Sequence, residues 1–153
     1  MQFIQDKLSD IGKLNFVAFY QNTTDGSTFT STMTEEISNV VADQNQCRIS
    51  DHWKMTRDGA TMNDADAQFL LRDVQDIVVI PIVQLTNDTY ARAGVTGLIA
   101  TSTNPPLTAL VVRRPHGVMN LFPFTDADLA DRVVKALTHA VELCGDGSKP
   151  EPF

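Results

Sequence analysis

The residues best suited to chemistry are three neighbours, Asp51, His52 and Trp53. An acid, an imidazole and an indole are groups that could line a polar ligand pocket. The segment predicts a strand, on which adjacent side chains point to opposite faces, so Asp51 and His52 are not expected to pair directly. Two interpretations follow. Either the three residues form one wall of a ligand pocket, or Trp53 belongs to the core while His52 is exposed to solvent.

Two cysteines, Cys47 and Cys144, form a second candidate pair. They lack the C-x-x-C spacing of zinc and redox sites, so no metal is expected there. A nucleophilic role for Cys47 is not expected either, because the adjacent Arg48 would point to the other face of a strand. The two cysteines form a disulfide or remain as reduced, buried side chains. A disulfide would indicate an exported protein, periplasmic or secreted.

Two pairs of acids suggest metal binding at first sight, Asp64 with Asp66 and Asp126 with Asp128. Calcium needs about six to eight oxygen ligands, and neither pair lies in an EF-hand loop. A solvated turn explains the first pair, and the dipole of a following helix explains the second. We therefore expect no metal and no cofactor. The chain also lacks G-x-S-x-G, H-E-x-x-H and glycine-rich phosphate-binding motifs, so we predict that it is not an enzyme.

Composition limits the classes of partner. The chain has 153 residues and a formal net charge of −7, which fits a single domain and argues against binding to nucleic acid or an anionic membrane. We expect a soluble protein whose partner, if it has one, is a protein or peptide. The longest apolar run ends at Pro81 and is far shorter than the roughly 20 residues that cross a bilayer. The N-terminal residues show no signal-peptide pattern, so Met1 is expected to be either the native start or the first residue after a removed leader.

The elements that must position these residues are mostly strands. Residues 2–11 predict a short helix that ends at Gly12. Alternating patterns and Asp-Gly turns predict about seven strands in hairpin order. They are 14–20, 27–41, 47–56, one ending near residue 71, 74–82, 107–113 and 118–124. Strand 27–41 has a threonine-rich face and is expected at a sheet edge, whereas residues 83–106 contain several turn signals and interrupt the strands.

The strongest pattern is an amphipathic helix over residues 126–144. Thr125 is the expected N-cap and Gly145 the expected C-cap. The apolar stripe consists of Leu129, Val133, Ala136, Leu137, Ala140, Val141 and Cys144. The chain is thus divided into an N-terminal helical segment (1–12), a single domain (13–145) and a flexible tail (146–153).

This plan resembles the pleckstrin-homology-like superfold over most of residues 14–144. The resemblance rests on the strand order, on the last strand running directly into the final helix, and on the apolar stripe of that helix. It implies a mainly β (α+β) fold, an antiparallel seven-stranded open barrel or orthogonal sandwich capped by the C-terminal helix. The first hairpin, at residues 23–26, lacks the cationic loop of lipid-binding members, so headgroup binding by that route is not expected.

Three functions follow as hypotheses. The leading one is a small non-enzymatic binding or interaction module, with a peptide on a strand edge or beside the helix; Phe122, Phe124 and Leu129 are its candidate contacts unless they belong to the core. The alternative is a small-molecule binder or enzyme with a cavity inside the β-structure, lined by Asp51, His52 and Trp53. A third is a structural or assembly subunit that pairs through strand 27–41.

Overall fold

The computed structural model describes residues 1–146, which form eight strands and three α-helices. The strands are β1 (Lys13–Asn22), β2 (Thr28–Asp43), β3 (Arg48–Arg57), β4 (Ala60–Leu70), β5 (Asp76–Pro81), β6 (Leu98–Asn104), β7 (Thr108–Arg113) and β8 (Met119–Phe124). The helices are α1 (Gln2–Ser9), α2 (Ile82–Arg92) and α3 (Ala127–Asp146), with short 3-10 turns at Leu71–Asp73 and Pro115–Gly117. All seven predicted strands are present, and the mainly β fold with a C-terminal helix is confirmed. The eighth strand, β6, lies with α2 in the segment that the sequence left without a prediction.

The strands form two antiparallel sheets, and neither is closed into a barrel. The larger sheet has the order β4-β3-β2-β1-β6, and the smaller has the order β5-β7-β8. The expected edge position of strand 27–41 is therefore wrong, because β2 is the central strand of the larger sheet. Its threonines are solvated because they lie on the outer face of the sheet, while the inner face of the same strand buries Ser31, Met33 and Glu35.

Helix α1 covers the part of β2 that β1 does not reach. Strand β1 starts at Lys13 opposite Glu36, so the last residues of β2 have no strand partner on that side. The Gln5 side-chain oxygen accepts a hydrogen bond from the Ala42 backbone N–H at 3.0 Å. Covering a bare edge in this way prevents the strand from pairing with another chain.

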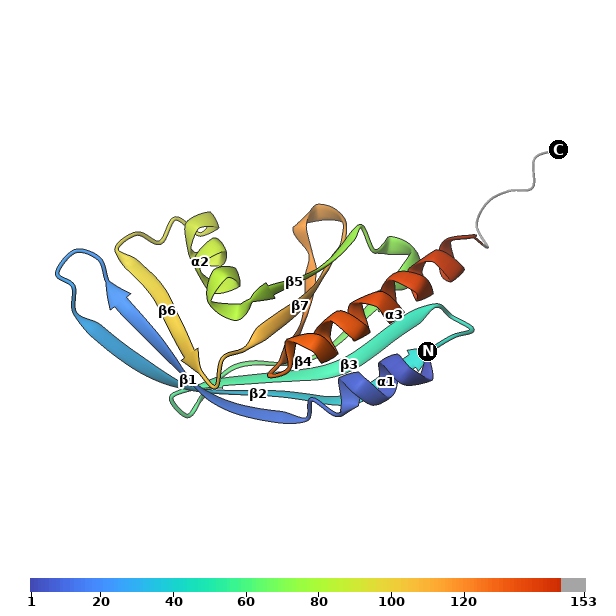
Figure 1. Cartoon of the computed structure of the whole chain (residues 1–153), viewed down its shortest axis with the longest axis horizontal. Coiled ribbons are helices and arrows are strands. Elements are labelled where there is room, and N and C mark those ends of the chain that lie inside the picture. The colour runs from blue at the N-terminus through green and yellow to red at the C-terminus, as the bar shows by residue number, and fades with distance from the viewer. Residues whose placement is uncertain (147–153) are drawn as a thin grey trace.

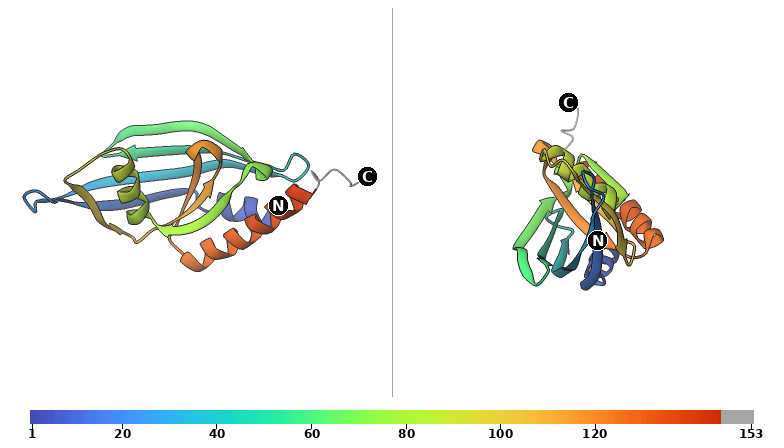
Figure 2. Two further views of the ribbon diagram at one scale, coloured as in Figure 1. Left: turned by 90° about the horizontal axis from the view of Figure 1, so that it is seen from above. Right: turned by 90° about the vertical axis from the view of Figure 1, so that its left-hand side faces the viewer.

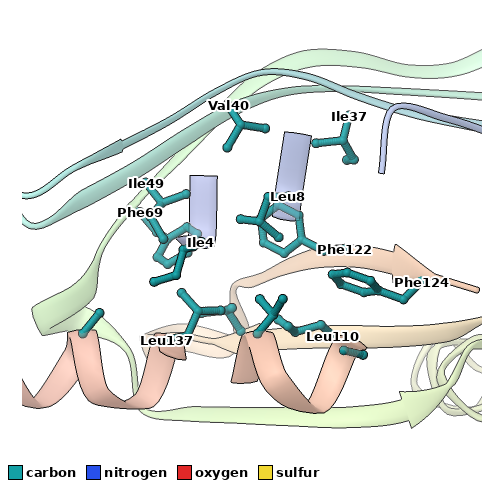
Figure 3. Packing of buried hydrophobic residues seen from close by; sticks show 14 of the residues in the cluster. Ile4, Leu8, Ile37, Val40, Ile49, Phe69, Leu110, Phe122, Phe124 and Leu137 are labelled. Atoms are coloured by element: carbon teal, nitrogen blue, oxygen red, sulfur yellow. The ribbon is translucent and has the colours of Figure 1, made fainter. Parts of the chain in front are cut away.

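The main core contains residues of both sheets together with α1 and α3. The two helices lie at the same end of the molecule (Figures 1 and 2). Figure 3 shows side chains from α1, β2, β8 and α3 directed toward one another, among them Leu8, Ile37, Phe122 and Leu137. Leu8 and Leu137 are completely buried. The apolar stripe of α3 thus packs against both sheets and α1, as its pattern predicts.

Of the two alternatives for the cysteines, the disulfide is the one present, and it ties α3 to the start of β3. Cys47 and Cys144 are bonded, with Cα atoms 5.8 Å apart and 97 residues between them in the sequence. Cys47 has a positive φ of 48° in the turn before β3.

Both expected caps of α3 require correction. Asp126, not Thr125, is the N-cap, because its Oδ1 accepts hydrogen bonds from the N–H groups of Asp128 (2.9 Å) and Leu129 (3.1 Å). Gly145 lies within the helix, which runs to Asp146. The rest of the predicted flexible tail, residues 147–153, lies outside the described residues. None of the helices in residues 1–146 combines the length and apolar character needed to cross a membrane.

Candidate cavity and its buried acid

A cavity of about 240 Å³ lies at the opposite end of the larger sheet from α3. Its floor is the inner face of β1, β2, β3 and β6, its roof is α2, and one wall comes from Met119 and Leu121 of β8. This volume corresponds to about eight water molecules at their liquid volume. It is slightly below the range of about 300–1,000 Å³ for drug-sized ligand sites, so it suits a small organic molecule.

The floor is hollow because small side chains occupy its centre. Ala18 of β1 lies opposite Thr103 of β6 on one side and opposite Ser31 of β2 on the other. Ala18, Ala100 and Thr103 all line the cavity. Since protein interiors are otherwise close-packed, three small residues under a fixed roof leave a gap that their neighbours do not fill.

Asn87 fixes the roof to the sheet. Its Nδ2 donates to the Ala100 carbonyl at 3.0 Å, and its Oδ1 accepts from the Ala100 N–H at 2.8 Å. The side-chain amide therefore pairs with the backbone of β6 as a neighbouring strand would. Figure 1 shows the resulting position of α2 beside β6. The apolar residues Ile82 and Leu85 of α2 face down into the cavity.

Glu35 is the most unusual residue of the cavity. It is buried, with only 8 % of the residue exposed. On the inner face its cross-strand neighbours are Leu14 and Met55, and it makes no hydrogen bond or ion pair with any described residue. Burial alone raises the pKa of Glu35 to about 7, because no nearby charge or donor stabilises the carboxylate.

Three other polar side chains line another part of the cavity: Tyr20, Arg57 and Tyr90. Arg57 Nη2 donates to the Tyr20 hydroxyl oxygen at 3.5 Å, and the guanidinium carbon lies 5.9 Å from the centroid of the Tyr20 ring. Tyr20 also stacks on Phe29, with ring centroids 5.1 Å apart. Burial raises the pKa of Tyr20, Tyr90 raises it further, and Arg57 partly opposes the change.

The structure does not bring the three predicted pocket residues together. Trp53 lines the cavity and packs against the main core. Asp51 is buried on the same face but outside this cavity, beside a separate polar hollow, and its Oδ1 has no hydrogen-bond partner. Burial, the largest effect, raises the pKa of Asp51 to about 6; His52 lowers it and Asp66 raises it.

His52 lies on the outer face, as the alternation of a strand requires. Its Nδ1 is 2.7 Å from Asp66 Oδ1, and its Nε2 is 2.7 Å from Asp64 Oδ1. These hydrogen bonds raise the pKa of His52. Within residues 1–146, no group of three or more His, Cys, Asp or Glu side chains is arranged to hold a metal ion.

The predicted partner contacts lie in or beside the main core. Phe122 and Phe124 are 1 % and 4 % exposed, and Leu129 is partly buried against the same cluster. A peptide could reach the two phenylalanines only if that core opened.

No family model, no curated protein and no solved structure matches this chain. The resemblance to the pleckstrin-homology-like superfold therefore stays a prediction, and so does a peptide-binding role.

Proposed function

We propose that this protein binds a small, predominantly apolar molecule in the cavity between α2 and the larger sheet. One observation carries the proposal: an apolar space of about 240 Å³ contains a buried acid, Glu35, that has no partner among the described residues. Apolar walls with a few polar groups that fix orientation are the usual construction of small-molecule sites. The proposal concerns binding and includes no chemical step.

Trp53 offers a direct test, because it is the only tryptophan and it lines the cavity. Titration with 2-phenylethanol and with 1-octanol, two neutral probes of suitable size, is expected to change its fluorescence in a saturable manner. The same titration followed by NMR should shift the amides of β1, β2 and α2 while leaving those of α3 in place.

A matched pair of substitutions locates the binding. Ala18→Leu should fill the floor and weaken binding of both probes by at least about tenfold, since a Leu side chain occupies ligand space. Ala127→Leu makes the same change at an exposed residue at the start of α3, outside the cavity, and should bind like the wild type. Absence of saturable binding for both probes, or equal binding by Ala18→Leu, would contradict the proposal.

We also propose that the protein is exported. The Cys47–Cys144 disulfide supports this, because such bonds persist in oxidising compartments. Thiol labelling of protein taken directly from its native cells tests it: both cysteines should resist labelling until a reductant is added.

A further inference from the structure

Glu35 lies at the centre of an apolar patch on the cavity floor. Its neighbours across the strands are Leu14 and Met55, and its neighbours along β2 on the same face are Met33 and Ile37. None of these four side chains can donate a hydrogen bond. The diagonal neighbours on β3, Trp53 and Arg57, do carry donors, but neither is hydrogen-bonded to Glu35. The carboxyl oxygens are unbonded yet not fully enclosed, so the small exposed fraction of Glu35 opens into the cavity. A ligand can therefore reach the carboxyl group directly.

The other titratable groups around the cavity form no ion pair or hydrogen bond with Glu35. They are Tyr20 on β1, Arg57 on β3 and Tyr90 on α2; α2 and β8 contribute no charged side chain to the lining. Arg57 is directed to Tyr20, on which it lies and to which it donates a hydrogen bond. Neither Arg57 nor the two tyrosines contributes to the raised pKa of Glu35, which has burial as its only cause. The acid is left without a counter-charge from the described residues.

The residues that line the cavity suit a ligand with a cationic group attached to an apolar hydrocarbon part. Aromatic rings of Phe16, Trp53 and Tyr90 line the same space, and the faces of aromatic rings attract ammonium groups. The net charge of −7 adds a weak general attraction for cations. A buried carboxylate is costly unless it is paired with a positive charge, and a ligand ammonium group would provide that charge for Glu35.

We propose that the cavity selects small apolar amines, with Glu35 as the counter-ion of the ligand's ammonium group. This inference rests on the proposed function, since it names the ligand class of the same cavity. On binding, the ligand nitrogen donates a charge-assisted hydrogen bond to a Glu35 oxygen, while the hydrocarbon part contacts the methionines and aromatic rings. If Glu35 is protonated beforehand, its proton is released to solvent.

The test compares size-matched probes in the wild-type protein by Trp53 fluorescence and calorimetry. 2-Phenylethylamine and 2-phenylethanol differ only in the ammonium or hydroxyl group, and 3-phenylpropanoate supplies the opposite charge. At pH 8 the amine should bind at least about tenfold more tightly than the alcohol, the usual effect of a hydrogen bond to a charged group.

The pH dependence gives a second, independent readout. Because burial raises the pKa of Glu35 to about 7, the carboxyl group is mostly neutral at pH 6 and must lose its proton to bind an ammonium ion. An alkylammonium ion itself stays protonated over this range. The affinity for the amine should therefore fall about tenfold from pH 8 to pH 6, with proton release, while the affinity for the alcohol stays constant.

Glu35→Gln should abolish both the preference for the amine and its pH dependence while keeping binding of the alcohol. The measurements on wild-type protein decide the matter even if this variant does not fold. Equal affinities for amine and alcohol at pH 8, or tighter binding of the propanoate, would overturn the inference and leave small-molecule binding intact. If none of the three probes binds, the proposed function itself fails, which is a distinct result.

Discussion

The two ends of the larger sheet share strands β2 and β3 but differ in how they are filled. At the α3 end, Ile49 of β3 belongs to the same hydrophobic cluster as Leu8 and Leu137, and all three residues are fully buried. At the α2 end, the same two strands present Glu35 and Trp53 to a cavity. The difference shows that one continuous sheet supports a close-packed region and a hollow one, with the change set by a few side chains.

The two helices that cover the sheet are also attached differently, α3 by more buried contacts than α2. Helix α3 is held by an apolar stripe and by the disulfide to Cys47. Helix α2 is held mainly by the Asn87 amide on β6 and by the apolar residues Ile82 and Leu85. Regions with few buried contacts open at lower free energy than the core does. We therefore expect the α3 end to determine global stability and the α2 end to determine ligand binding.

Removing the disulfide should have the largest effect on stability. In the chain-entropy treatment, a crosslink spanning 97 residues stabilises the folded state by about 4–5 kcal/mol. The double variant Cys47→Ser, Cys144→Ser should lower the free energy of unfolding by this amount in urea titrations. Where the variant remains folded, its affinity for 2-phenylethanol should match that of the wild type. A large loss of affinity would show that the two ends are coupled.

Truncating one apolar side chain at each end compares them directly. Leu137→Ala leaves a hole in a filled core and should cost about 3–5 kcal/mol. Met33→Ala is expected to cost about 2 kcal/mol or less, because Met33 borders space that is already empty and loses fewer contacts. Thermal or urea unfolding of both variants tests this order. Equal losses would indicate that the cavity is filled in solution and stabilises the fold.

Local patterns were sufficient to predict the parts of the fold that follow from spacing. Alternation and Asp-Gly turns predicted seven strands, and the stripe from Leu129 to Cys144 predicted α3. Whether Cys144 is bonded to Cys47 stayed open, because that depends on the distance between two residues far apart in the chain. The central position of β2 was mispredicted because exposed threonines report which face is solvated, not whether both edges are paired. The N-cap was placed one residue too early because Thr125 and Asp126 are both good caps, and only hydrogen bonding distinguishes them.

The cavity could not be predicted, because it depends on contacts between residues far apart in the chain. Ala18 and Thr103 look unremarkable in sequence, and only the pairing of β1 with β6 places them together. Alternation places Glu35 on the same face of its strand as Met33, but only the assembled sheet shows that this face lines a cavity. Helix α2 did leave a signal, the helical spacing of Ile82, Leu85 and Thr89, but the nearby glycines and prolines obscured it.

The acid at the hollow end should make stability depend on pH. The folded state favours neutral Glu35, whose pKa is raised to about 7 from 4.5, whereas the unfolded chain ionises near the lower value. The stability that Glu35 contributes is therefore fully present below about pH 4.5 and is lost as the pH rises through about 7. Above that pH it no longer changes, and the total loss is up to about 3 kcal/mol. His52, with a raised pKa and an exposed position, changes stability in the same direction.

Glu35→Gln isolates that contribution. The free energy of unfolding of the variant minus that of the wild type should increase from pH 5 to pH 8, because only the wild type must bury a carboxylate at high pH. Urea titrations at three pH values measure it. Asp51→Asn serves as the comparison, since its transition should come at a lower pH, near its folded pKa of about 6. A flat difference for Glu35→Gln would mean that Glu35 is hydrated or paired in solution.

The smallest expected effect concerns the attachment of the roof. Asn87→Ala removes two hydrogen bonds to Ala100 and should cost about 1–2 kcal/mol, the usual net contribution of two such bonds. Because the loss falls on α2 alone, amide hydrogen exchange should accelerate in Ile82–Arg92 and stay unchanged in α3. Binding of 2-phenylethanol should weaken in parallel, since part of the binding energy must then order the helix. Asn87→Asp keeps the acceptor for the Ala100 N–H but places a carboxylate oxygen against the Ala100 carbonyl, so it should destabilise α2 at least as much as Asn87→Ala. Uniform acceleration across both helices would mean that α2 belongs to the same cooperative unit as the core around α3.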